Sequence, residues 1–203
     1  MSAAVDQARG RLQGRRVLHV AIEPWRPPRL DELAPGRVLA FDATLSHCGW
    51  VKMEATETSF RVWDRGTINP MTTQASYLET WDKARQLAPQ LDRLFVTHGC
   101  DAEIVVEAPL ASSMGSRTES SLIAGMLVWM HAPARTAVVS ATRVSKVLLG
   151  DHQVRSAERK KAIRAAVIAL VPGCAGRDWN EHQRDALATG LTYLFDKSRR
   201  PIA

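Results

Sequence analysis

Four side chains that can bind metal ions or transfer protons occur in three well-separated parts of the sequence. Asp42 ends the apolar run VLAF, and Glu107 ends the apolar run IVV. His182 and Asp185 lie in HQRDALATGL, where their three-residue spacing places both on one face of a helix. Carboxylates that converge raise one another's pKa values, and divalent cations relieve the repulsion. Oxygen ligands suit Mg2+ or Mn2+ better than Zn2+, so we predict a two-metal site that cleaves phosphodiester bonds.

Each of these residues also has a purely structural interpretation. Asp42 could open a turn, because its side chain can bond to the backbone two residues further on. Glu107 could be a surface acid at the end of a strand, and the histidine could be an exposed residue of its helix. Asp185 could pair with an arginine, either Arg184 or Arg143. The indication of a site therefore comes from the order and context of the set, not from any one member.

The elements that must position these residues follow one another in the order β-β-β-α-β-α-β-α-α. Apolar and alternating runs predict strands at 37–42, 48–54, 58–67, 103–107 and 137–139. Apolar residues at three- and four-residue steps predict helices at 74–98 with a kink or break at Pro89, at 117–131, at 157–171 with Ser156 as cap, and at 180–196. A short helix or a turn is expected at 142–149. Three antiparallel strands followed by alternating helices and strands predict an α/β fold, a mixed sheet flanked by helices.

This order would bring the acids to one edge of the sheet. If the strands that end at Asp42 and Glu107 are parallel neighbours, a strand spacing of ~4.8 Å places both carboxylates together. Sheets of this kind bind ligands at the carboxyl ends of their strands. In the last helix, small residues such as Ala188 and Gly190 allow a close approach to the sheet. Asp185 borders the apolar stripe of that helix, where a charge is costly unless it is paired or bound to a metal.

The charge of the chain favours an anionic partner. The 203 residues carry a formal net charge of +6, and nucleic acid is the commonest partner of such basic proteins. Between residues 143 and 164, seven basic residues stand against two acids, a balance of +5. This stretch could also be an ordinary solvated helix face. Acids with metal ions in a basic protein indicate phosphodiester cleavage in nucleic acid.

Composition indicates where in the cell the protein is expected and in which redox state its cysteines are. No apolar run approaches the ~18 residues of a membrane span, and no secretion signal follows the arginines near the N-terminus. We therefore expect a cytoplasmic protein that has no membrane partner. Three cysteines lie far apart without a C-x-x-C pair, so we expect reduced, mostly buried thiols.

Residues 1–36 differ from the rest of the chain. They contain four of the ten prolines, and the run EPWRPPRL fits neither a regular helix nor a central strand. We expect a Pro- and Arg-rich extension at 1–36, in which 17–22 could form a short strand. The folded domain is expected at 37–198.

The order of motifs resembles the RuvC family of Holliday junction resolvases, within the RNase H-like superfamily. RVLAFDATLSHCGWVKM resembles the family's first strand with its first acid, followed by a Gly-bearing second strand. EIVVEAPLASSMGS resembles the strand that carries a glutamate, followed by a loop. VVSATRVSKVLLGDHQVRSAERKKAIRAAV resembles a strand, a lysine-bearing turn and a basic helix, and HQRDALATGL resembles the terminal helix. The resemblance covers roughly residues 37–195.

The resemblance implies a fold and an activity. The fold would be an RNase H-like, five-stranded mixed sheet, with three antiparallel and then two parallel strands, flanked by helices. Asp42, Glu107 and Asp185 would be catalytic acids that bind two Mg2+ ions, for which Mn2+ can substitute, and His182 would take the fourth catalytic and metal-binding place. The enzyme would be an endodeoxyribonuclease of the crossover junction type, active in a bacterial or phage-infected cell.

The resemblance also implies how DNA is held. A homodimer would place two sites on opposed strands of a four-way junction. Phosphates would be contacted by six basic residues: Arg143, Lys146, Arg155, Arg159, Lys160 and Lys161. The family often has an aromatic residue three positions after the glutamate, where this chain has Leu110 with Met114 nearby, so an apolar wedge would act at the junction centre.

Two other classes of protein remain open on the sequence. The stretch FDATLSHCGW also resembles the phosphate-binding hairpin of actin-like and sugar-kinase ATPases. Those proteins usually need two such domains, and this chain would be a fragment of one. The other alternative is a non-catalytic DNA-binding module that keeps the fold, against which the retention of all three acids argues.

Overall fold

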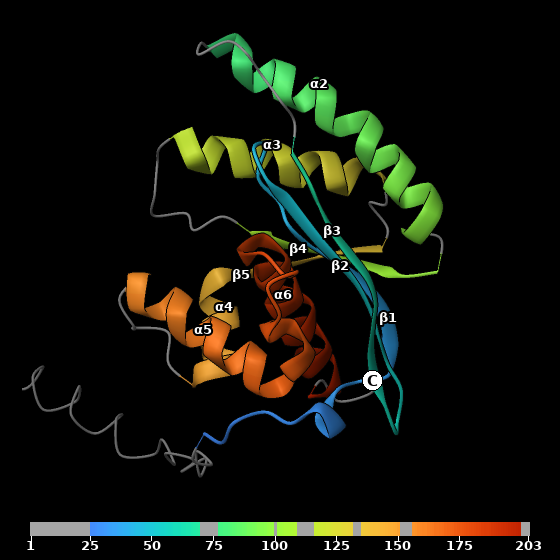
Figure 1. Ribbon diagram of the computed structural model, residues 1–203. Helices are drawn as coiled ribbons and strands as arrows, with labels where there is room; N and C mark the ends of the chain where they lie inside the picture. Colours follow the sequence, from blue (N-terminus) through green and yellow to red (C-terminus); the bar gives the residue numbers. More distant parts are fainter. Residues whose placement is uncertain are drawn as a thin grey trace, which may run out of the picture.

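A five-stranded mixed sheet forms the centre of the protein (Figure 1). The computed structural model describes residues 25–69, 77–99, 101–108, 116–131, 135–150 and 156–199. The strands are β1 (Gly36–Asp42), β2 (Cys48–Ala55), β3 (Phe60–Ile68), β4 (Glu103–Ala108) and β5 (Thr136–Ser140). Their order is β3-β2-β1-β4-β5, with β1, β2 and β3 antiparallel and with β4 parallel to both β1 and β5. The predicted sheet, with its change from antiparallel to parallel pairing, is confirmed.

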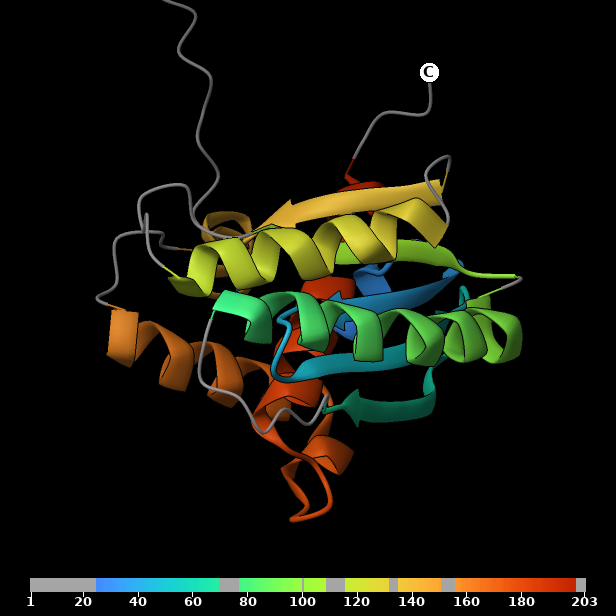
Figure 2. The same ribbon diagram turned by 90° about the horizontal axis from the view of Figure 1, so that it is seen from above.

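Helices cover both faces of this sheet, as the two views in Figures 1 and 2 show. On one face lie α2 (Tyr77–Leu94), which continues as the π-helix η2 (Phe95–Gly99), and α3 (Ser116–His131). On the other face lie α4 (Ala141–Leu149), α5 (Ser156–Leu170) and α6 (Glu181–Ser198). Two short 3-10 helices, η1 (Leu30–Glu32) and η4 (Pro172–Ala175), complete the described elements.

Strand β1 separates two apolar cores because its side chains alternate between the faces. Leu39 and Phe41 pack into the core beneath α2 and α3. Val38 and Ala40 pack into the core beneath α4, α5 and α6. The next residue on this second face is Asp42, so the alternation points its carboxylate toward α6.

The end of the predicted extension packs on the domain. Leu33 and Ala34 are buried, and the backbone N–H of Ala34 donates to the carbonyl of Leu194 in α6 at 3.2 Å. The indole of Trp25 donates to the carbonyl of Val147 in α4 at 3.5 Å. The extension therefore reaches the core a few residues before the expected boundary at 36. The strand predicted at 17–22 lies outside the described residues.

Several smaller predictions can be compared with these elements. Helix α2 continues through Pro89 as far as Leu94 instead of breaking there. Ser156, predicted as a cap, is the first residue of α5. Cys48 and Cys174 are buried free thiols, as expected. None of the helices in the described part of the chain is both long and apolar enough to cross a bilayer.

Candidate active site

Asp42 and Glu107 lie side by side at one edge of the sheet. Phe41 of β1 is opposite Val106 in the parallel pair with β4, and the two acids are the next residue on each strand. Val105 packs in the same core as Ala40, so alternation turns Glu107 toward α6 as it does Asp42. The prediction that these strands are parallel neighbours with their acids at one edge is confirmed.

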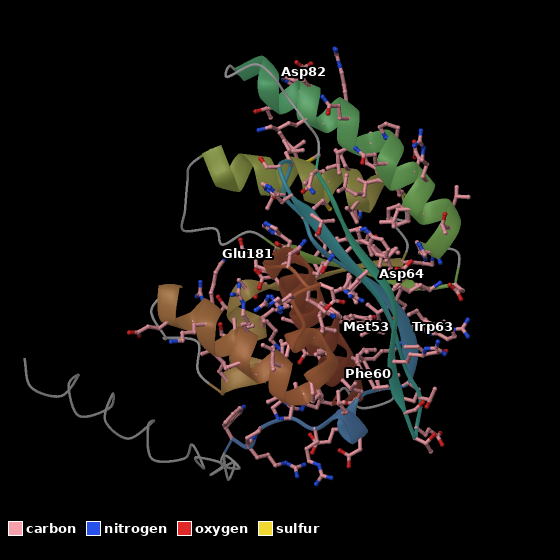
Figure 3. All side chains as sticks on the ribbon, viewed as in Figure 1. Met53, Phe60, Trp63, Asp64, Asp82 and Glu181 are labelled. Atoms are coloured by element: carbon pink, nitrogen blue, oxygen red, sulfur yellow. The ribbon has the colours of Figure 1, made fainter. Side chains whose placement is uncertain are left out.

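Helix α6 brings the remaining residues to this edge because it lies directly on the sheet. A Cβ atom on Gly190 would be 2.4 Å from Cε of Met53 and 3.0 Å from Cβ of Ala40, so a larger residue would require the Met53 side chain to shift and would press on Ala40. Figure 3 shows Met53 between the sheet and α6, and Glu181 where α6 begins. The side chain of Asn180 caps the helix by accepting a hydrogen bond from the backbone N–H of Gln183 at 3.0 Å.

His182 is held against Asp42 by a close contact between α6 and β2. Nδ1 of His182 lies 2.8 Å from Oδ2 of Asp42 and can donate to it. Gly49 pairs with Asp42 across the β1–β2 ladder, and a Cβ atom on Gly49 would lie 2.4 Å from the backbone carbonyl of His182. The hydrogen bond to Asp42 raises the pKa of His182, against the opposing effect of burial. The ring of His47 stacks on His182 with centroids 5.0 Å apart.

Asp42, Glu107 and Asp185 line one pocket, together with residues of α4 and α5. Burial, and then the negative charges of Asp42 and Asp185, raise the pKa of Glu107 to about 8. Burial and the charge of Asp42 raise the pKa of Asp185 to about 6. These shifts are the signature of carboxylates that share a poorly solvated site, in which each negative charge disfavours the others.

The carboxylates of the pocket are chemically suitable ligands for divalent cations, although in this structure they contact other side chains. Within the described residues, no group of three or more Asp, Glu, His or Cys side chains is arranged, as it stands, so that it could hold a metal ion. Asp42 faces His182, and Nζ of Lys160 lies 3.8 Å from Oδ2 of Asp185. Because carboxylate oxygens suit Mg2+ and the mutual repulsion raises their pKa values, cations in this pocket would relieve a strain that the protein alone does not.

The proposed alternative partners of Asp185 are engaged elsewhere. Arg143 forms a two-pronged ion pair with Asp196, with Nε 2.7 Å from Oδ2. Arg184 donates to the backbone carbonyls of Cys174 and Gly176 at 2.9 and 3.0 Å. Among the described residues, Asp185 instead pairs with Lys160, which the resemblance implies as a phosphate contact.

The predicted DNA-contacting residues are only partly gathered at the site. Arg159 and Lys160 line the acidic pocket from α5. Lys146 and Lys161 are exposed, whereas Arg143 is occupied by its ion pair with Asp196. Leu110, Met114 and Arg155 lie outside the described residues.

Two residues of the site were not singled out from the sequence. Thr189 donates a hydrogen bond toward Glu107, and its place four residues after Asp185 on the same helix face could have indicated it. His47 lies in the turn between β1 and β2, but no spacing in the sequence relates it to His182. Their contacts depend on how α6 lies on the sheet.

The sheet order, the helices on both faces and the acids at its edge define an RNase H-like α/β fold. No protein-family model matches the sequence, and no curated protein matches it either. Among solved structures, the chain is similar to RuvC from Thermus thermophilus. The structure of that protein in complex with a Holliday junction substrate has 15% identity and a TM-score of 0.60, covering 80% of this chain and 94% of that one.

Two further solved structures are also similar to this chain. A second structure of Thermus thermophilus RuvC has 17% identity and a TM-score of 0.58, covering 79% of this chain and 95% of the other. Ydc2, a yeast mitochondrial Holliday junction resolvase, has 11% identity and a TM-score of 0.50, covering 82% and 83%. At these identities the likeness shows a shared RuvC-like fold.

Proposed function

We propose that this protein is a Mg2+-dependent endonuclease that nicks branched DNA, with four-way junctions as the preferred substrate. One observation carries the proposal: acids from three elements, Asp42, Glu107 and Asp185, line a single pocket. Two carboxylates on neighbouring strands and one on a helix packed against them offer oxygen donors from three directions. Such a set suits a pair of hard divalent cations.

Each residue of the pocket has a role in this proposal. Asp42, Glu107 and Asp185 would hold the cations, which when bound would supply water activation and stabilisation of the leaving oxygen. His182, hydrogen-bonded to Asp42 at 2.8 Å, would ligate one cation or orient the attacking water. Lys160 would leave Asp185 and contact the phosphate, since its side chain is 73% exposed and its pairing distance is a loose 3.8 Å.

Branched DNA is proposed as the substrate on the basis of charge and fold. Arg159 and Lys160 line the pocket, and Lys161 follows them on the exposed surface of α5. Cations placed in this way contact the DNA backbone and position it without reading its sequence. The fold is shared with Thermus thermophilus RuvC, which has been solved on a Holliday junction substrate.

The proposed enzyme acts as a homodimer that pairs through α3 and the edge strand β5. Met126, Trp129 and Met130 are exposed at helical spacing on α3, with exposed fractions from 49% to 65%. Val138 of β5 is 65% exposed, and it lies on the α3 side of the sheet because its neighbour Val139 packs on the other. Exposed apolar side chains gathered in this way mark an interaction surface. A two-fold axis there would give two sites for two strands.

Cleavage of a set of DNA substrates tests the proposal directly. The full chain is incubated with four-way, three-way, flap and linear DNA, each with Mg2+, with Mn2+ or with EDTA. We expect Mg2+-dependent nicks in opposed strands of the four-way junction and little cleavage of linear DNA. Absence of cleavage with both Mg2+ and Mn2+ would contradict a nuclease, and equal cleavage of linear DNA would contradict junction preference. ATP hydrolysis measured in parallel would reveal an actin-like ATPase.

A further inference from the structure

Thr189 joins two of the pocket's acids from within the core. It lies in α6, where its side chain is fully buried. Its Oγ1 is 3.0 Å from the backbone carbonyl of Asp185, one helical turn earlier, and 3.3 Å from Oε2 of Glu107. The hydroxyl therefore bridges the helix that carries one acid and the strand that carries the other.

The chemistry of a hydroxyl suits it to hold Glu107. A hydroxyl has one proton to donate, and because both partners of Thr189 are acceptors, that proton is shared between the carbonyl of Asp185 and Oε2 of Glu107. The terminal torsion of a glutamate is broad, so packing alone does not fix the plane of its carboxylate. A hydrogen bond from Thr189 to Oε2 selects one orientation of that plane. The other oxygen, Oε1, is then left to act as a ligand.

We propose that Thr189 is a positioning residue that orients the carboxylate of Glu107 for a divalent cation. This inference rests on the proposed function, because it assigns Thr189 a role in the same metal site. Groups that orient metal ligands in this way typically change metal affinity by about 10- to 100-fold when they are removed.

A neighbouring threonine provides a matched control. Thr192, one turn further along α6, is also fully buried. Among the described residues, its Oγ1 is a buried side-chain oxygen without a hydrogen-bond partner. Thr192→Val removes a buried hydroxyl from the same helix without removing a contact, and Thr189→Val removes the hydroxyl that contacts Glu107. Thr189→Ser keeps that hydroxyl on a smaller side chain.

The experiment measures Mg2+ binding itself, independently of cleavage. Mg2+ is titrated into the full-length wild type and the variants by calorimetry, and the Mg2+-induced rise in melting temperature is recorded alongside. We expect Thr189→Val to weaken Mg2+ binding by about 10- to 100-fold, with Thr189→Ser and Thr192→Val close to the wild type. Circular dichroism compares the fold of each variant, and Thr189→Ala serves as a second test if the valine variant does not fold.

The outcomes separate the inference from the proposed function. If the wild type binds Mg2+ and Thr189→Val binds it equally well, the role of Thr189 is overturned while the metal site stands. If Thr192→Val weakens binding as much as Thr189→Val, the effect belongs to the helix and not to the hydroxyl at 189, which also overturns the inference. A wild type that binds no divalent cation overturns the metal site and, with it, the role of Thr189.

Discussion

Asp42 at the end of β1 and His182 at the start of α6 are in hydrogen-bonding contact, although 140 residues separate them in the chain. Nδ1 of His182 lies 2.8 Å from Oδ2 of Asp42, and the aspartate is 17% exposed. The contact joins the central strand of the sheet to the last helix at Asp42, which lines the acidic pocket. A substitution at this contact can therefore test whether DNA binding and cleavage depend on different residues.

Asp42→Asn should abolish nicking and leave junction binding largely intact. The substitution keeps the size of the side chain and an oxygen that can accept from His182, but it removes a charge from the proposed metal site. Removal of a ligand should exceed the effect of removing an orienting group, so we expect cleavage to fall by more than about 100-fold. Single-turnover nicking and gel-shift titration of a four-way junction measure the two properties. Equal loss of binding and cleavage would argue against a catalytic role.

Neutral side chains at Lys160 and Lys161 should weaken junction binding in a salt-dependent way. Each phosphate contact that is lost lowers the slope of log K against log salt by about 1. The double change to glutamine should therefore reduce the slope by up to about 2. Arg85→Gln is the control, since Arg85 is 83% exposed on α2, on the opposite face of the sheet. A slope that stays unchanged in the double variant would place α5 away from the DNA.

Gly49→Ala should displace the start of α6 from β2. The added Cβ would meet the backbone of His182 at 2.4 Å, and a backbone cannot move aside as a flexible side chain can. We expect a loss of about 1–3 kcal/mol in the free energy of unfolding, together with reduced cleavage. Gly173→Ala is the matched control, because no atom lies within 4 Å of a Cβ there. Chemical denaturation checks stability, and similar results for the two variants would rule out the proposed clash.

Exposed apolar side chains on α3 should hold two copies of the protein together. Trp129→Glu places a charge beside the exposed apolar side chains of Met126 and Met130 on α3. Desolvating that unpaired charge opposes pairing, so the variant should sediment as a monomer at concentrations where the wild type is a dimer. Trp81→Glu on α2, whose side chain is 62% exposed, is the control. A wild type that is monomeric at all concentrations would contradict the proposed pairing.

Glu103 should make the attachment of α6 to β4 sensitive to acid. Burial raises the pKa of Glu103, but hydrogen bonds from Lys197 and Tyr193 outweigh it and leave the pKa below its usual value of 4.5. A carboxyl with a lowered pKa in the folded state adds stability above its unfolded pKa, and this stability is lost as the pH falls through the folded value. Melting curves between pH 3 and 7 should show a smaller pH dependence for Glu103→Gln. An equal pH dependence of the melting temperature in the wild type and in Glu103→Gln would contradict this role of Glu103.

The strand ends were the most predictable part of the site. The runs VLAF and IVV are long enough and apolar enough to indicate buried strands, and the acid that follows each run is fixed by the chain itself. Once β1 and β4 are parallel neighbours, the adjacency of Asp42 and Glu107 follows. The face of α6 that carries His182 and Asp185 could likewise be predicted from their spacing.

The partners of individual charges could not be predicted in the same way. The pairing of Arg143 with Asp196 and the position of Lys160 beside Asp185 depend on how α4, α5 and α6 pack together. Sequence spacing constrains neighbours within one helix but not between helices. The contact of Gly49 with His182 could not be predicted either, because a glycine in a strand does not indicate which segment packs against it.

The position of α6 on β1 and β2 has a consequence for protein synthesis. A ribosome completes β1 and β4 long before the segment 181–198, so a nascent chain carries Asp42 and Glu107 while Asp185 and Thr189 do not yet exist. The acidic pocket can be assembled only after α6 has been synthesised. A product of premature termination upstream of α6 would thus lack the pocket and, under the proposed function, would be unable to cut the DNA of the cell that made it.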